Sequence, residues 1–136
     1  MAAQYNIEES TDFNPKFNKN GLIPAIAQDV HTGDILMVAY MNRQSLDLTI
    51  ETGYATYYSR SRQALWKKGQ ESGHLQKVVQ ILVDCDQDCL VLKVVVDAGQ
   101  CHVGYRSCFY RALKKDSNKK MVFIADKVYD PKETYK

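Results

Sequence analysis

Residues 77–96 read KVVQILVDCDQDCLVLKVVV, and this stretch decides the fold. Two runs rich in β-branched residues, 77–84 and 90–96, flank a polar connection centred on Asp-Gln-Asp at 86–88. β-branched side chains favour extended backbone, and Asp is common in tight turns. The stretch therefore predicts two strands joined by a tight connection.

The sequence before it predicts a second strand pair and a helix. The apolar runs 22–30 and 34–41 flank a His-Thr-Gly turn at 31–33, which indicates a β-hairpin. Asn42 suits the N-cap of a helix running to about residue 52, and Gly53 suits its left-handed end. The expected buried stripe of this helix consists of Leu46, Thr49 and Ile50.

Weaker signals lie elsewhere in the chain. Residues 54–59 are aromatic and β-prone and predict a strand, and residues 121–128 predict a last strand. Residues 59–74 carry few strand signals, and residues 107–113 are compatible with either a helix or a strand. Together these patterns predict a strand-rich α+β fold.

The composition is that of an ordinary globular chain. Its 136 residues are 45% hydrophobic and 25% charged, with a formal net charge of +2. This length can bury a core without disulfides, and so mild a charge argues against a nucleic-acid-binding protein. We expect a loosely ordered lead-in over 1–20, a main body over 21–113, and a C-terminal strand and tail of the same domain over 114–136.

Neither an export signal nor a membrane span is visible. The first twenty residues lack an apolar stretch, and no run approaches the ~18 continuous apolar residues of a span. We therefore expect a cytoplasmic protein without a membrane partner. Its four cysteines should then be reduced thiols that are available to a metal.

Three carboxylates, Asp84, Asp86 and Asp88, lie close together in the chain. In extended backbone they would share one side and Cys85 would point to the other, although a tight turn could also let them converge. Such like charges repel unless a cation offsets them, and oxygen ligands suit Mg²⁺, Ca²⁺ or Mn²⁺. The alternative is a solvated hairpin tip. An EF-hand is excluded, because its glycine position would be Cys89.

The cysteines offer thiolates, which select zinc or another soft metal. Cys85, Cys101 and Cys108 lack the CxxC spacing of a zinc ribbon. If Cys89 joins them, four thiolates would close a structural zinc site. If it does not, the fourth position would hold water, whose pKa zinc lowers toward neutrality. In that second case His102 could act as a general base or orient the water.

Residues 59–74, SRSRQALWKKGQESGH, add a basic and polar segment. Arginine forks and serine hydroxyls suit phosphate oxygens, and tryptophan offers a stacking face. With the arginine of the GYRSC turn, the segment outlines a pocket for a phosphorylated, nucleotide-like ligand, and a solvated basic loop is the alternative. The candidate ligand-binding residues are Arg60, Arg62, Trp66, Lys68, Ser72, His74 and Arg106.

Five segments together resemble the phosphoribosyl-AMP cyclohydrolase family. They are LIPAIAQD, ILMVAYMN, TGYATYYSRSRQALWKKGQESGHLQKV, VDCDQD and CHVGYRSCFYR, and they cover most of residues 21–111. The resemblance implies a monofunctional hydrolase that opens the adenine ring of phosphoribosyl-AMP at the N1–C6 bond, in the third step of histidine biosynthesis. Residues 21–113 would then be its catalytic domain.

The resemblance also implies the metals and the assembly. It implies an intertwined homodimer with active sites at the subunit interface. For the reaction of this family, we expect His102 to assist proton transfer and the basic residues, with Mg²⁺, to hold the two phosphates of the substrate. The metal ligands implied by matching positions are Cys85, Cys101 and Cys108 for one Zn²⁺ per subunit, shared between subunits, and Asp84, Asp86 and Asp88 for Mg²⁺.

Two positions depart from the family pattern, and two rival functions stand beside it. Cys89 replaces a small apolar residue, so we interpret it as a non-ligand, and Gln70 stands where glutamate is common. A non-catalytic zinc module that binds RNA or a protein would use four zinc ligands. A zinc deaminase would carry an HxE…PCxxC signature, which this sequence lacks.

Overall fold

A six-stranded sheet forms the body of the protein in the computed structural model, which describes residues 6–97, 99–116 and 119–134. Its strand order is β4-β3-β2-β1-β6-β5. Among the described strands of this sheet, the central pair β1–β6 is the only parallel one. The strands are β1 (Ile23–Asp29), β2 (Ile35–Met41), β3 (Thr56–Ser59), β4 (Ala64–Lys67), β5 (Lys77–Val83) and β6 (Leu90–Val95).

Both predicted strand pairs are confirmed. β1 pairs with β2, and β5 pairs with β6, each antiparallel. The connection between β5 and β6 is a turn and not extended backbone, because Asp84 Oδ1 accepts the N–H groups of Asp88 (2.9 Å) and Cys89 (3.1 Å). A side chain that replaces backbone partners in this way stabilises a turn. Of the two arrangements considered for residues 84–88, the structure has the tight turn, and the predicted tight connection is confirmed.

The predicted helix is α1 (Arg43–Thr52), and its caps are the predicted ones. Asn42 Oδ1 accepts the Ser45 N–H (2.8 Å), and Ser45 Oγ accepts the Asn42 N–H in return (2.9 Å). Gly53 closes the helix at φ +79°, a conformation that costs glycine little.

The buried stripe of α1 differs from the predicted one at two positions, Ser45 and Ile50. Ser45, Leu46 and Thr49 are buried, whereas Ile50 is 54% exposed. Thr49 explains the rotation of the helix, because its hydroxyl accepts the Thr56 N–H (3.0 Å) at the start of β3. That bond turns the Thr49 side of the helix inward.

The core lies between the central strands and the segments that cover them. β1 and β6 alternate buried and half-buried residues, which is the pattern of strands with one face packed on a core. The fully buried side chains include Ile23, Leu36, Met41, Leu46, Tyr57, Leu90, Leu92 and Val94.

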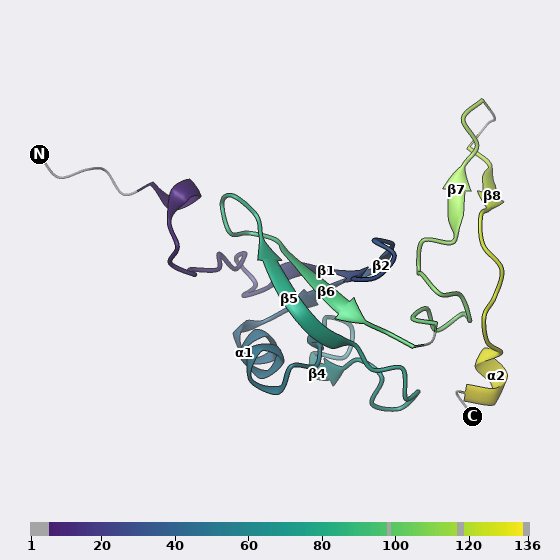
Figure 1. Ribbon diagram of the computed structural model, residues 1–136, viewed down its shortest axis with the longest axis horizontal. Coiled ribbons are helices and arrows are strands. Elements are labelled where there is room, and N and C mark those ends of the chain that lie inside the picture. Colours follow the sequence, from purple (N-terminus) through teal and green to yellow (C-terminus); the bar gives the residue numbers. More distant parts are fainter. Residues whose placement is uncertain (1–5, 98, 117–118, 135–136) are drawn as a thin grey trace, which may run out of the picture.

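A two-stranded arm, β7 (Arg111–Leu113) with β8 (Met121–Phe123), stands away from the sheet (Figure 1). The ambiguous stretch 107–113 therefore ends in a strand, and the predicted strand over 121–128 is confirmed only for its first three residues. The sequence reading missed β4 inside the basic segment, the short helix η1 (Ile7–Glu9) and the short helix α2 (Pro131–Thr134).

Some of the predicted lead-in and tail lies outside the described residues, namely 1–5, 117–118 and 135–136. In the described part of the chain, no helix has the length and apolar character needed to cross a membrane.

Candidate active site

The loop of residues 99–108 carries two of the predicted zinc ligands and is fastened to β2. The Cys101 N–H donates to the Tyr105 carbonyl (3.0 Å), which folds the loop back on itself. The Cys108 N–H donates to the Leu36 carbonyl of β2 (2.7 Å). Both cysteines thus stand on one loop, and their thiols are close enough for the Cys101 thiol to affect the pKa of Cys108.

Arg106 anchors the same loop to the turn after β1. Its guanidinium pairs with the Asp29 carboxylate and donates to Thr32 Oγ1 (3.0 Å). Burial alone would raise the pKa of Asp29, but the backbone N–H groups of His31 and Thr32 and the Arg106 charge outweigh it, so that this pKa lies below its ordinary 3.8. Arg106, a predicted phosphate contact, is thus placed in an ion pair at the turn.

A cavity of about 430 Å³ opens beside the cysteine loop. This volume is within the range of small-molecule sites. Met37 and Val38 of β2 contribute apolar surface that the sequence reading did not anticipate. Six predicted site residues line the cavity: Arg62, Trp66, Lys68, Ser72, His102 and Cys108.

Behind the cavity, a chain of buried hydrogen bonds holds Lys68 in place. Lys68 is 5% exposed, and its ammonium donates to the Gln100 carbonyl (2.8 Å). Gln76 Nε2 donates to Gln100 Oε1 (2.9 Å), and the Tyr57 hydroxyl donates to Gln76 Oε1 (2.6 Å). Burial raises the pKa of Tyr57, so its hydroxyl remains a donor. Sequence reasoning missed both glutamines, because a buried Gln carries no pattern.

The ammonium of Lys68 also acts on the cysteine pair. Partial removal from water and the adjacent Cys101 thiol raise the pKa of Cys108 to about 12, and the positive charge of Lys68 opposes this rise. A cation beside the Cys108 thiol favours its thiolate form, which is the form that binds metals. The donor set at Cys101 and Cys108 therefore fits a soft metal such as zinc.

Two further predicted contacts lie outside this cavity. The Arg60 guanidinium stands 4.2 Å from the ring centroid of Tyr40. The His74 ring packs edge-on against Tyr129, with centroids 4.9 Å apart, and its buried Nδ1 lacks a hydrogen-bond partner among the described residues. Neither arrangement places the side chain against the cysteine pair.

The predicted acidic cluster is gathered at the tip of the β5–β6 hairpin. Asp84, Asp86 and Asp88 are exposed, and one oxygen from each lies within 4.8 Å of the others. Hydrogen bonds to Asp86 and Asp84 and the charges of those carboxylates raise the pKa of Asp88 to about 6. Crowded carboxylates of this kind fit a hard divalent cation such as Mg²⁺.

Cys85, on the same tip, lies far from Cys101 and Cys108 of its own chain. The tip and the cysteine loop are at opposite ends of β6 (Figure 1). A strand of that length spans about 17 Å at ~3.4 Å per residue, whereas ligands to one zinc each lie ~2.3 Å from it. Cys85 therefore cannot join Cys101 and Cys108 within one subunit.

Comparison with known proteins identifies the family. The model of the family described as phosphoribosyl-AMP cyclohydrolase matches residues 37–110, a stretch that contains the cavity, the acidic tip and the cysteine pair. The chain belongs to the phosphoribosyl-AMP cyclohydrolase family. Membership of this family means that the protein is an enzyme and not the non-catalytic zinc module considered as a rival. The prediction of a cyclohydrolase of histidine biosynthesis is confirmed.

Several curated phosphoribosyl-AMP cyclohydrolases resemble the chain over most of its length. The protein of Methanococcoides burtonii is 56% identical over 120 residues, covering 88% of this chain and 94% of the relative. The protein of Bradyrhizobium diazoefficiens is 49% identical over 137 residues, covering 99% and 98%. The protein of Chloroherpeton thalassium is 54% identical over 119 residues, covering 84% and 85%.

Proposed function

We propose that this cyclohydrolase is a metal-dependent homodimer whose zinc is held by Cys101 and Cys108 of one subunit and the partner subunit's Cys85. One observation carries the proposal. The Cys101 and Cys108 thiols lie near each other on the loop beside the cavity, whereas Cys85 of the same chain lies in the β5–β6 connection, at the other end of β6. Two thiols leave a zinc site incomplete, and a symmetric dimer supplies the third ligand twice.

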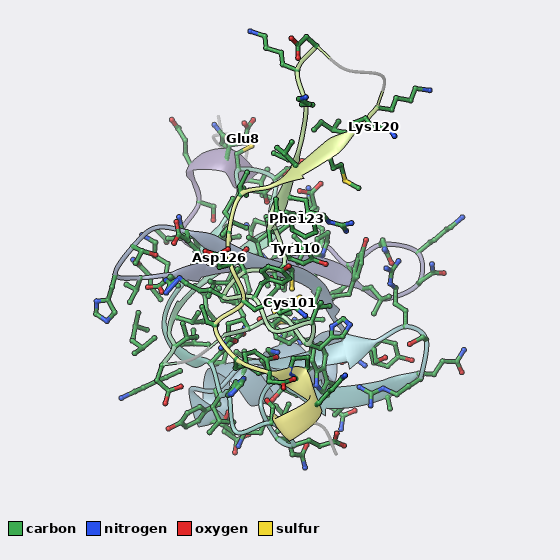
Figure 2. All side chains as sticks on the ribbon, turned by 90° about the vertical axis from the view of Figure 1, so that its right-hand side faces the viewer. Glu8, Cys101, Tyr110, Lys120, Phe123 and Asp126 are labelled. Carbon is green, nitrogen blue, oxygen red and sulfur yellow. The ribbon has the colours of Figure 1, made fainter. Side chains whose placement is uncertain are left out.

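Exposed apolar surface supports the dimer. Monomeric proteins rarely leave an apolar edge strand and an apolar arm uncovered. The aromatic rings of Tyr110 and Phe123 stack at the base of the arm with centroids 6.2 Å apart, and Figure 2 shows both residues at the lower end of the β7–β8 hairpin. The exposed large apolar residues of β5 and the arm region are Val79, Leu82, Val83, Phe109, Leu113, Met121, Val122, Phe123 and Ile124.

The reaction that we propose is hydrolytic opening of the adenine N1–C6 bond. Zinc, when bound, lowers the pKa of a water molecule and so supplies a nucleophile at neutral pH. His102 lines the cavity next to Cys101 and is the side chain suited to take the proton of that water and return one to N1 as the bond breaks. The lone pair left on N1 is thereby protonated, and C6 becomes a carboxamide.

The cavity walls suit the rest of the substrate. Trp66 offers a face on which the adenine can stack, while Arg62, Lys68 and Ser72 line the same cavity and carry donors of the kind that bind phosphate oxygens. Mg²⁺ on Asp84, Asp86 and Asp88 would neutralise phosphate charge. Arg60 lies outside the cavity lining and remains a proposed phosphate contact. Arg106 and His74 are proposed to affect substrate binding indirectly, by holding the loops to which they belong. A cytoplasmic location remains a prediction.

Mixed dimers test the shared zinc site. Cys85→Ser and Cys101→Ser proteins should each be inactive and zinc-poor, and Cys89→Ala is the matched control that keeps both zinc and activity. When the two inactive proteins are unfolded and refolded together, half of the dimers should be hybrids with one intact site, which gives about a quarter of wild-type ring-opening activity. No recovered activity from zinc-loaded, dimeric mixtures would refute the shared site.

A further inference from the structure

Gln87 differs from its neighbours at the tip of the β5–β6 hairpin. The carboxylates of Asp84, Asp86 and Asp88 are exposed, whereas Gln87 is only 5% exposed. Its backbone is left-handed, with φ at +61°. Residues other than glycine seldom adopt this conformation, and here the Gln87 N–H donates to the Asp84 carbonyl within the turn (3.1 Å) while further contacts come from outside it.

The partner that holds Gln87 is the N-terminal segment of residues 12–16. Gln87 Oε1 accepts the Asn14 N–H (2.7 Å), and Gln87 Nε2 donates to the Asp12 carbonyl (3.1 Å). The Gln87 carbonyl accepts the Lys16 N–H (2.7 Å). Side chain and backbone of one residue thus bind three groups from a distant part of the chain, and both ends of the amide are satisfied.

We propose that Gln87 is a positioning residue for the divalent cation at the acidic tip, and that residues 12–16 belong to the support of that site. This inference rests on the proposed function, which assigns the cation to the three carboxylates. Gln87 lies between Asp86 and Asp88 in the chain, so that fixing its backbone fixes both neighbours. Asp84 is held separately by the N–H groups that it accepts within the turn.

The physical need for such a support follows from charge. Three carboxylates with oxygens within 4.8 Å repel one another, and an unsupported hairpin tip would relax by moving them apart. A support that keeps them together lowers the reorganisation needed when the cation binds. Residues 12–16 of the predicted lead-in therefore hold the turn of the three carboxylates in place through their hydrogen bonds to Gln87, and we call this set of contacts the clasp.

Two glycine substitutions distinguish the effect of losing the Gln87 side-chain hydrogen bonds from the effect of placing a glycine at a turn position with positive φ. Gln87→Gly removes the side-chain hydrogen bonds while keeping a residue that tolerates left-handed backbone. Gln63→Gly is the matched control, because Gln63 also lies in a hairpin turn with positive φ (+50°) but is exposed. Mn²⁺ binding to the zinc-loaded proteins is measured by electron paramagnetic resonance, with circular dichroism as the check on folding.

The expected result is a Kd for Mn²⁺ about tenfold weaker in Gln87→Gly and unchanged in Gln63→Gly. Wild-type affinity in a folded Gln87→Gly protein would overturn the inference alone. If the Asp86→Asn protein binds Mn²⁺ as tightly as the wild-type protein does, the assignment of the cation to the three carboxylates is wrong, and the inference about Gln87 is wrong with it. The two failures are therefore distinguishable.

A second measurement needs no variant. Since coupling is reciprocal, a clasp that strengthens cation binding must itself be strengthened by the cation. Hydrogen exchange at the Asn14 and Lys16 amides should slow by up to about tenfold when Mg²⁺ is added to the wild-type protein. Unchanged exchange at both amides, with Mg²⁺ bound, would contradict the proposal.

Discussion

Replacing Asp29 by Asn tests how the cysteine loop is attached to the sheet. Asp29 is 3% exposed and pairs with Arg106, which the loop contributes. The Asn side chain keeps an acceptor for the N–H groups of His31 and Thr32 but removes the negative charge. The substitution therefore isolates the ion pair from the turn that Asp29 also closes.

The expected loss of unfolding free energy depends on how far the Asp29–Arg106 pair is removed from water. A fully buried pair loses about 3–5 kcal/mol when one partner is removed, whereas exposed pairs contribute about 0–1 kcal/mol. The Arg106 side chain is 37% exposed, so solvent screens the pair and rehydrates the freed guanidinium. We expect Asp29→Asn to lower the free energy of unfolding by about 1–2 kcal/mol, between those two cases.

The pH dependence has a definite sign. Asp29 has a lowered pKa in the folded protein, so its contribution is present above the ordinary value of 3.8 and is lost as the pH falls through the folded value. Urea unfolding of wild type and Asp29→Asn should therefore differ at pH 7, and the difference should shrink toward pH 3. Asp34→Asn is the control, because Asp34 lies 3.6 Å from the same arginine but is 61% exposed.

A double-mutant cycle decides whether the pair itself is responsible. Asp29→Asn and Arg106→Gln, alone and together, should give a coupling energy of about 1 kcal/mol. The zinc content of the single variants should fall, because the loop carries Cys101 and Cys108. A coupling energy near zero, or a pH-independent effect of Asp29→Asn, would refute the argument.

Other perturbations address the remaining features. Asn42→Ala removes the N-cap of α1 and should lower the free energy of unfolding by about 1 kcal/mol in a thermal melt. Gln76→Leu leaves the Tyr57 hydroxyl buried without its acceptor, and should cost about 1–3 kcal/mol in urea unfolding, partly restored by adding Tyr57→Phe. His102→Ala should lower kcat by at least about 100-fold with zinc content unchanged in metal analysis; a near-normal rate would assign proton transfer elsewhere. Gly69→Ala should destabilise the cavity loop, visible as a lower melting temperature, because the new Cβ would meet backbone atoms at 2.4 Å.

Local patterns made much of the fold predictable. The β1–β2 and β5–β6 hairpins and the caps of α1 follow from alternation, turn residues and the Asn42 side chain, each of which acts within a few positions. β4 was missed because its residues, ALWK, carry weak strand signals and gain order from pairing with β3. Ile50 was misplaced because the Thr49–Thr56 bond, a tertiary contact, sets the rotation of the helix.

The candidate site was predictable where its residues carry distinctive chemistry. Acidic, thiol and basic side chains in motif spacing led to the cavity, the acidic tip and the cysteine pair. Gln76, Gln87 and Gln100 could not be found in this way, since a glutamine is informative only once its partners are known. The ion pair of Arg106 joins residues far apart in the sequence, so its role at the β1 turn depended on the folded topology.

The parallel contact between β1 and β6 has a consequence for folding kinetics. Ala25 in β1 pairs with Leu90, the first residue of β6, so this contact joins two strands that are far apart in the sequence. Non-local pairing of this kind slows folding, because loop-closure entropy is lost before the contacts form. During synthesis the β1–β2 hairpin leaves the ribosome long before β6, the strand that pairs with the other edge of β1. Its apolar edge is therefore exposed longest, and this is where chaperones or premature association would act on the nascent chain.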